Sequence, residues 1–232
     1  MKKFVPPTLI IALVLTSLVV LPLSRANAQA GLASSVLTKM QKSQQTLKTL
    51  SADISMEKYN SQLHDSDQYY GTIKYIPVAG RSAFVRLEWT KPSHEVLAIA
   101  NGAYVLWRPR LNQAIIGTTN SIKSGKDNDV LALLNMSASQ LRARFGEFQD
   151  TREETLWGGV KATHLKAVPK TVASYKYIEV WVDDSGMPVQ TKMVEKNDDS
   201  TTVRLSNVAK NQNIDKKEFS IDLPSSVKKI KG

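Results

Sequence analysis

The side chains able to do acid–base or metal chemistry are few and far apart in this sequence. The three histidines, His64, His94 and His164, are isolated, and none has a partner at the i, i+4 spacing of a helical metal site. The chain has no cysteine, which excludes thiolate catalysis, iron–sulfur clusters, cysteine zinc sites and disulfides. We therefore interpret each histidine as a surface or core residue, and we predict no metal and no cofactor.

Three pairs of neighbouring carboxylates are the remaining candidates for catalysis: Glu153-Glu154, Asp183-Asp184 and Asp198-Asp199. Adjacent residues on a strand point to opposite faces of a sheet, and these pairs lie at expected turns, so they do not support a shared acid–base site. The sequence also lacks a GxSxG nucleophile motif and a glycine-rich phosphate loop. The pattern favours a binding protein over an enzyme, although a site assembled from distant strands would leave no local motif.

The N-terminus is typical of a secretory signal peptide. Lys2-Lys3 precede an uncharged apolar run, Thr8 to Leu23, which is shorter than the roughly 20 residues that a transmembrane helix needs. Small residues then flank two cleavage sites, after Ala28 and after Ala30. We predict an exported, periplasmic protein whose signal peptide is residues 1–30; a retained N-terminal anchor is the alternative.

The remaining domain, residues 31–232, is basic, because the whole chain carries a formal net charge of +10 and only three of its 31 Lys and Arg residues lie in the signal peptide. The densest basic stretches are Lys216-Lys217 and Lys228–Lys231. The lysines are otherwise dispersed and not interleaved with aromatic residues, so we predict no nucleic-acid partner. Anionic lipid or an acidic protein suits the charge better, and solvated edges explain the basic stretches equally well.

Hydrophobic spacing predicts one helix followed by strands in the first half of the domain. From Leu32 to Leu50 apolar residues recur at helical spacing. Short runs of β-forming residues follow, separated by proline and glycine. These expected strands are Asp53–Tyr59, Tyr69–Ile76, Ala83–Thr90, Glu95–Ala100 and Tyr104–Trp107.

The second half returns to helix and then to strands. Helical spacing between Asn128 and Phe145 predicts two short helices, with Ser137 as an N-cap between them. The expected strands after them are Glu147–Thr151, Thr155–Val168 with a turn at Gly158-Gly159, Tyr175–Asp183, Val189–Glu195, Thr201–Val208 and Phe219–Ile221. Because Val85, Leu87 and Trp89 alternate with polar residues, the sheet has one dry face that helices must cover. We predict a single α+β domain with about ten antiparallel strands in one curved sheet.

Several short motifs occur in a characteristic order along the domain. They are Val36–Met40, Leu47–Ser55, Arg86–Pro92, Ala100-Asn101-Gly102, Leu106–Pro109 with Asn112-Gln113, Ile178–Asp183, Gly186-Met187-Pro188, Thr201–Asn207 and Phe219–Pro224. In this order they resemble the LolA family of periplasmic outer-membrane lipoprotein carriers, over nearly all of the domain. The resemblance implies an incomplete antiparallel barrel, a half-barrel whose mouth is lidded by helices and whose hydrophobic cavity holds acyl chains. It also implies a monomeric carrier that takes acylated lipoproteins from an inner-membrane exporter to an outer-membrane acceptor.

The apolar residues expected to line that cavity come from the dry face of the sheet and from the helices. They are Val36, Met40, Leu47, Val85, Leu87, Trp89, Leu97, Ile99, Val105, Trp107, Leu133, Leu134, Leu141, Ile178, Val180 and Val182. A filled core has the same sequence pattern as a cavity, so the alternative is that these residues are simply core. Arg108 and Arg110 are candidates for contact with a head group or an acidic partner, and exposed salt bridges explain them equally well.

One position departs from the family pattern. LolA carriers have an arginine before the proline that ends the second strand, where it bonds to the lid, whereas Ile76 precedes Pro77 here. Either Arg81 or Arg86 is a candidate substitute; without one, the lid switch differs and the cargo could be a glycolipid or a phospholipid. A lipid-sensing regulatory domain like RseB is a further alternative. Chain length argues against it, because that sensor has an additional C-terminal domain.

Overall fold

The computed structural model describes residues 23–79, 82–119 and 125–232. The helices are α1 (Leu23–Thr46), α2 (Lys126–Leu134) and α3 (Ala138–Arg144), with two 3-10 turns, η1 (Pro109–Leu111) and η3 (Lys216–Phe219). The strands of the first half are β1 (Leu50–Asn60), β2 (Asp65–Ile76), β3 (Phe84–Lys91), β4 (Glu95–Ala100), β5 (Ala103–Arg108) and β6 (Gln113–Thr118). The strands of the second half are β7 (Phe145–Leu156), β8 (Val160–Pro169), β9 (Tyr175–Asp183), β10 (Pro188–Glu195), β11 (Ser200–Lys210) and β12 (Lys228–Lys231).

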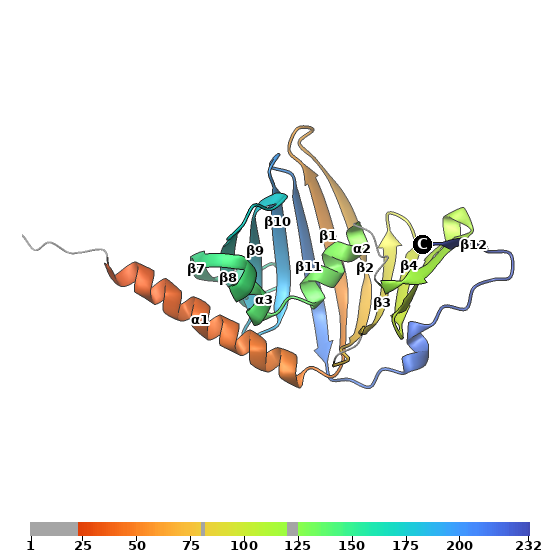
Figure 1. The fold of residues 1–232 in the computed structure, drawn as a ribbon, viewed down its shortest axis with the longest axis horizontal. Helices are drawn as coiled ribbons and strands as arrows, with labels where there is room; N and C mark the ends of the chain where they lie inside the picture. The colour runs from red at the N-terminus through yellow and green to blue at the C-terminus, as the bar shows by residue number, and fades with distance from the viewer. Residues whose placement is uncertain (1–22, 80–81, 120–124) are drawn as a thin grey trace, which may run out of the picture.

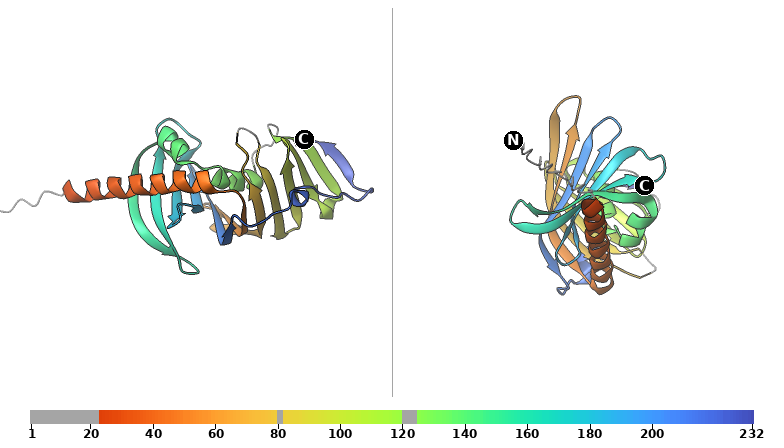
Figure 2. Two further views of the ribbon diagram at one scale, coloured as in Figure 1. Left: turned by 90° about the horizontal axis from the view of Figure 1, so that it is seen from below. Right: turned by 90° about the vertical axis from the view of Figure 1, so that its left-hand side faces the viewer.

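All the strands belong to one sheet, which curves around the helices. Its order is β12-β6-β5-β4-β3-β2-β1-β11-β10-β9-β8-β7, and the two end strands, β12 and β7, do not pair within the described residues. Every pairing is antiparallel except that of β12 with β6. Figures 1 and 2 show the resulting half-barrel, with α2 and α3 inside the curve and α1 alongside its β7 end. The prediction of an open α+β half-barrel is confirmed, with twelve strands.

Bulges and one glycine allow the sheet to bend. The pairing of β2 with β3 shifts register between Tyr70 and Gly71. A Cβ built on Gly71 would lie 2.2 Å from the carbonyl oxygen of Glu88, so only glycine fits this close approach of two strands. A second register shift, between Ser51 and Asp53, bends the pairing of β1 with β11. These irregularities increase the local twist and help the sheet to curl.

Helix α1 begins earlier and ends earlier than the sequence predicts. It starts at Leu23 and ends at Thr46, and the last residue of the predicted helix, Leu50, is the first residue of β1. The two expected cleavage sites lie within the first turns of α1, whereas residues 1–22 lie outside the described part of the chain. None of the helices in the described ranges combines the length and apolar composition that a membrane span requires.

The two short helices form as predicted, and their termini follow from the local sequence. Ser137 caps α3: its hydroxyl accepts from the Gln140 N–H, and the Gln140 side chain accepts from the Ser137 N–H. This reciprocal capping box satisfies two donors that the helix cannot pair internally. On α2, the buried residues Val130, Leu133 and Leu134 face the sheet. The apolar side of α2 therefore covers the middle of the concave face.

One predicted strand is wrong, and two strands were not predicted. The segment Phe219–Ile221 is not a strand, because Phe219 ends the 3-10 turn η3 and is buried against Phe84, with ring centroids 5.7 Å apart. The last strand is instead β12, whose parallel pairing with β6 joins segments more than a hundred residues apart. Strand β6 itself was not predicted. The segment between β11 and β12 thus crosses the outer face of β3 and β4, as the close packing of η3 on these strands shows.

Candidate functional site

The concave face of the half-barrel is covered by two apolar clusters. The larger joins β1 to β5 and β11 to the buried side of α2. The smaller packs α1 and α3 against β8 and β9, with Met40 and Val180 completely buried at its centre. Because both clusters lie between helices and sheet, any hollow between them is an internal, mostly apolar site.

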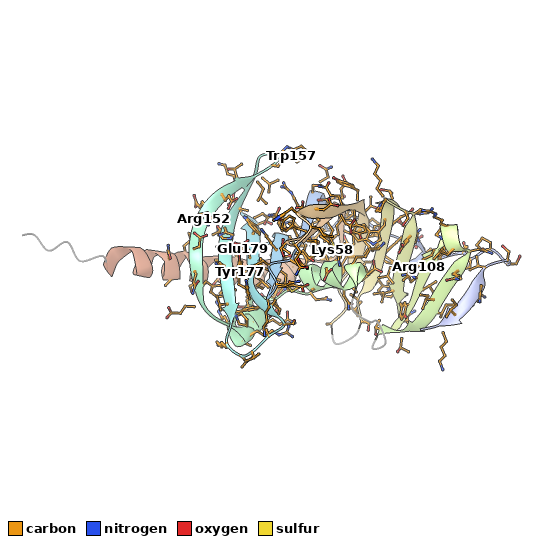
Figure 3. All side chains as sticks on the ribbon, turned by 90° about the horizontal axis from the view of Figure 1, so that it is seen from above. Lys58, Arg108, Arg152, Trp157, Tyr177 and Glu179 are labelled. Atoms are coloured by element: carbon orange, nitrogen blue, oxygen red, sulfur yellow. The ribbon has the colours of Figure 1, made fainter. Side chains whose placement is uncertain are left out.

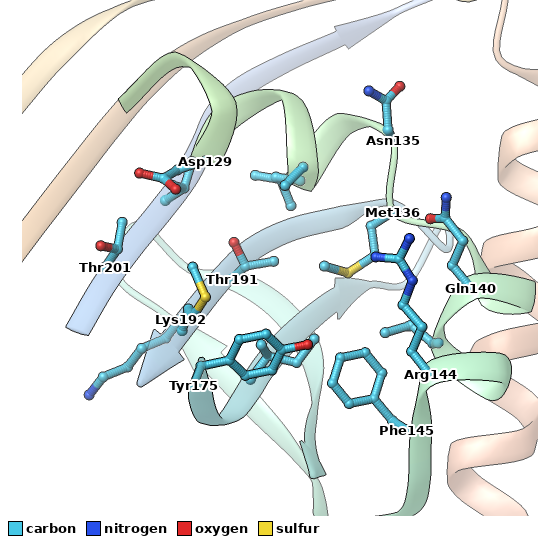
Figure 4. Close-up of a pocket in the computed structure, with 16 residues that line it drawn as sticks. Asp129, Asn135, Met136, Gln140, Arg144, Phe145, Tyr175, Thr191, Lys192 and Thr201 are labelled. Carbon is cyan, nitrogen blue, oxygen red and sulfur yellow. The ribbon is translucent and has the colours of Figure 1, made fainter. Parts of the chain in front are cut away.

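One such hollow lies between α2, α3 and the strands β9 to β11. Its volume is about 310 Å³, at the lower end of the range typical of small-ligand pockets. Figure 4 shows the side chains around it. The lining residues are Asp129, Ala132, Leu133, Asn135, Met136, Gln140, Leu141, Arg144, Phe145, Tyr175, Ile178, Thr191, Lys192, Met193, Thr201 and Val203. We call this hollow the apolar cavity.

Helix α2 separates the apolar cavity from a second hollow. That hollow has a volume of about 520 Å³ and is lined by residues of β2, β3 and β4, including Tyr75, Val85 and Ile99. Ala132 and Asn135 of α2 line both hollows. The helix is therefore the partition between the two hollows.

Several polar contacts tie this partition to its surroundings. The Trp89 indole N–H donates to Asp127 Oδ1 across 2.8 Å, and Lys58 Nζ lies 2.9 Å from Asp129 Oδ2. At the other end of α2, the Tyr75 hydroxyl donates to Asn135 Oδ1 at 3.4 Å, and the Gln44 side chain of α1 donates to the Met136 carbonyl at 2.6 Å. These contacts hold the helix to the sheet and to α1, in addition to the packing of its buried apolar residues.

Burial changes the acidity of two groups in these contacts. Burial raises the pKa of Asp127 above its usual range, although the hydrogen bond from Trp89 and the charge of Lys126 act in the opposite direction. Burial likewise raises the pKa of the Tyr75 phenol. The Asp127 carboxyl is therefore easier to protonate in the folded protein than in the unfolded chain.

A third hollow, of about 760 Å³, lies beyond the first turn of α2 and has a charged wall. There Glu95 Oε2 lies 3.0 Å from Lys126 Nζ and 3.6 Å from Arg108 Nε. Lys126 also lies over the Tyr69 ring, 5.3 Å from its centroid. Arg108, labelled with Lys58 in Figure 3, is the only one of the two predicted arginines that lines a hollow, since Arg110 is an exposed residue of η1.

The predicted wall residues fall into three groups. Leu133, Leu141 and Ile178 line the apolar cavity, while Val85, Ile99 and Leu97 line the second and third hollows. The second and largest group is packed into the two apolar clusters and lines none of these three hollows. Its members are Val36, Met40, Leu47, Leu87, Trp89, Leu134, Val180 and Val182.

Val105 and Trp107 form the third group, on the opposite face of the sheet. Leu97 pairs with Leu106, and Trp107 pairs with Val96. Residues directly opposite each other share a face, so Leu106 lies on the concave side and its neighbours Val105 and Trp107 lie outside. The structure therefore does not bring these two residues to the cavity.

Several lining residues were not predicted, among them Met136, Phe145, Tyr175 and Met193. Met193 pairs directly with Ile178 across the β9–β10 hairpin, so it shares the face of a residue that was predicted. The hairpin turn was expected from the sequence, and extending its register would have found Met193. The other three come from helix and strand ends that only tertiary packing brings together.

The family position before Pro77 is occupied by Ile76, at the end of β2. Of the two candidate substitutes, Arg81 lies outside the described residues. Arg86 donates to the carbonyl oxygens of Glu218 and Ser220, so it faces the C-terminal segment on the outer side and not α2.

The three histidines lie outside the hollows described above. His64 and His94 are exposed and contact Tyr59 and Glu88, respectively. His164 is buried on the outer face of β8, where its Nδ1 lies 2.9 Å from the Asp150 carbonyl oxygen. Across the described ranges, no group of three or more His, Asp or Glu side chains is arranged to hold a metal.

An open antiparallel half-barrel with helices over an apolar cavity is the architecture of a binding or carrier protein. The comparison with known families agrees with this class. A model of the family described as outer membrane lipoprotein carrier protein LolA matches residues 36–222. The chain belongs to this family.

Solved structures of similar fold are distant in sequence. An uncharacterised conserved protein from Thermus thermophilus has a TM-score of 0.54 and 12% identity, over 86% of this chain and 99% of that one. LprF from Mycobacterium bovis has a TM-score of 0.51 and 10% identity, over 84% and 97%. The MucA/MucB complex of Pseudomonas aeruginosa has a TM-score of 0.51 and 13% identity; the match covers 82% of this chain and only 61% of that chain. These likenesses show the fold alone, and no curated protein sequence matches the chain.

Proposed function

We propose that this protein is a periplasmic carrier that binds acyl chains of lipoproteins in the apolar cavity and moves them from the inner to the outer membrane. The observation that carries the proposal is the cavity itself, which lies between the covering helices and an apolar sheet face. Membership of the LolA family supports the same function. In this proposal the protein acts by binding and not by catalysis.

Hydrocarbon transfer explains why a lipoprotein needs such a carrier. Each buried CH₂ group is worth about 0.8 kcal/mol, so acyl chains exposed to water would cost tens of kcal/mol. Leu133, Ile178 and Met193 provide apolar wall for these chains. The cavity is small for several chains, but the second hollow lies directly across α2. Displacement of α2 during loading would join the two spaces.

Release requires that the loaded and empty states differ little in free energy. The polar contacts that hold α2 suit this requirement, because a partly exposed ion pair such as Lys58–Asp129 contributes on the order of 1 kcal/mol. Loading that displaces α2 therefore has to break these polar contacts and the packing of Val130, Leu133 and Leu134 against the sheet, a cost that burial of the acyl chains offsets. Arg108 and Arg110 remain candidates for contact with head groups or with the membrane partners, and we propose that the carrier acts as a monomer between an exporter and an acceptor.

Binding of a fluorescent fatty acid to the purified protein tests the acyl-chain site. Ile178→Trp fills the apolar cavity, and we expect it to weaken binding about tenfold or more. The matched control is Thr202→Trp, because Thr202 pairs with Lys192 and Glu57 on the outer face of the sheet. If Ile178→Trp leaves fatty-acid binding unchanged, the proposed site is wrong. Lipase or esterase turnover by the purified protein would contradict the carrier role.

A further inference from the structure

The apolar cavity has one end that is rich in hydrogen-bond donors. Arg144, the last residue of α3, and Tyr175, the first residue of β9, both line it. Figure 4 shows the Tyr175 hydroxyl pointing toward the side of the cavity occupied by Phe145 and Arg144. The rings of Tyr175 and Phe145 are 6.3 Å apart, so the Tyr175 ring lies beside the residue that follows Arg144 in the chain.

Neither donor has a partner in the described part of the chain. No hydrogen bond or ion pair of the Arg144 guanidinium or of the Tyr175 hydroxyl occurs there. The only carboxylate that lines the cavity is Asp129, which pairs with Lys58. Lys192 lines the cavity as well, but it lies opposite Glu179 in the strand register, on the face of the sheet opposite to that of Thr191. Arg144 thus lines the cavity as an exposed cation that pairs with no acid within the described residues.

We propose that the acyl-bearing ligand of this cavity carries an anionic group, a carboxylate or a phosphate, which binds to Arg144 and Tyr175. This inference rests on the proposed acyl-chain site and specifies the chemistry of its ligand. A planar guanidinium gives a carboxylate or phosphate two parallel N–H donors, and a phenol adds a third. The chain of the ligand lies against Leu133, Ile178 and Met193, and its charged end lies against α3.

The position of Arg144 at a helix C-terminus has a simpler structural explanation, which needs its own control. Cations in the last turn stabilise a helix by offsetting its dipole. Arg142 lies in the same last turn of α3 but does not line the cavity. A role in helix stability predicts equal effects for the two arginines, whereas a role in ligand binding predicts an effect for Arg144 alone.

Paired ligands that differ only in charge test the proposal. The probes are cis-parinaric acid and its methyl ester at pH 8, together with oleoyl lysophosphatidic acid and monooleoylglycerol as competitors. We expect the wild-type protein to bind a charged probe about fivefold more tightly than its neutral counterpart at low salt, as a partly exposed, charge-assisted contact would give. This preference should decrease in 0.5 M NaCl.

Arg144→Gln should remove the preference for the charged probes, whereas Arg142→Gln should keep it. Tyr175→Phe should reduce it partly. A preference for parinaric acid over its methyl ester alone would identify the anionic group as a carboxylate. A preference for lysophosphatidic acid over monooleoylglycerol alone would identify it as a phosphate. Equal binding of charged and neutral probes by the wild type, or equal effects of the two arginine variants, would overturn the inference while acyl-chain binding stands. Binding of none of the four would overturn both proposals.

Discussion

The indole Nε1 of Trp89 lies 2.8 Å from Oδ1 of Asp127, so a fully buried residue of the sheet holds the first turn of α2 by a direct hydrogen bond. Trp89→Phe keeps most of the apolar volume but removes the donor. Because Asp127 would remain buried without this partner, we expect the free energy of unfolding to fall by about 1–3 kcal/mol. Urea denaturation measures this change, and a stability equal to that of the wild type would show that the bond is not formed in solution.

The same pair predicts a pH dependence. Burial raises the pKa of Asp127, so the folded state favours the neutral carboxyl. Its contribution to stability is fully present below the pKa of an unfolded aspartate, about 4, and is lost as pH rises through the higher folded value. Asp127→Asn keeps an oxygen that accepts from Trp89 and cannot ionise. We expect the Tm of the variant to rise relative to that of the wild type as pH increases from about 4 to 7, until it is about 2 °C higher. Parallel curves of Tm against pH would contradict this.

Gly186, in the turn between β9 and β10, makes the closest approach of the sheet to α1. Its φ is +81°, and a Cβ at this position would lie 2.3 Å from the Lys39 carbonyl oxygen. We expect Gly186→Ala to cost about 3 kcal/mol, since backbone strain and a backbone clash add. Gly102 is the control: its φ is +80°, yet nothing lies within 4 Å of its Cβ position. Gly102→Ala should cost only about 1 kcal/mol, and equal losses in thermal unfolding would contradict the role of the contact.

Phe219 should contribute to stability but not to ligand binding. It is almost fully buried on the outer face of the sheet, against Phe84. Phe219→Ala should lower the free energy of unfolding by about 3–5 kcal/mol, as expected for a large core aromatic. Protein that remains folded should bind the fatty-acid probe with unchanged affinity. A selective loss of binding, measured at a temperature where the variant is folded, would link the C-terminal segment to the cavity.

The local pattern of β3 was enough to predict its faces. Val85, Leu87 and Trp89 alternate with polar residues, and all three are buried on the concave side. Alternation could not assign the faces of β5, because Val105, Leu106 and Trp107 are consecutive apolar residues. The two-residue turn Asn101-Gly102 fixes this register by pairing Ala100 with Ala103. Apolar residues on both faces of a strand cannot be sorted by hydrophobicity alone.

Other features depend on contacts between distant segments. Strand β12 pairs with β6 in parallel, a contact that no short window of sequence reveals. Phe219 has the apolar neighbours of a strand residue, but it fills a gap over Phe84 as part of a 3-10 turn. From the sequence, Arg144 is an ordinary cation at a helix terminus; only the packing of α3 places it beside the cavity. Hydrophobic spacing therefore predicted the fold and part of the wall, whereas the cavity depends on tertiary packing.

Native mass spectrometry of the protein purified from periplasm, followed by extraction and identification of any bound molecule, tests the central claim most directly. We predict a mass shift due to an acylated polypeptide or lipid in the wild type and in Thr202→Trp, and its loss in Ile178→Trp. A triacylated lipoprotein would identify the cargo as proposed, while a free lipid would move the function to lipid transport. Protein that carries no ligand and takes up no fluorescent fatty acid would contradict the account.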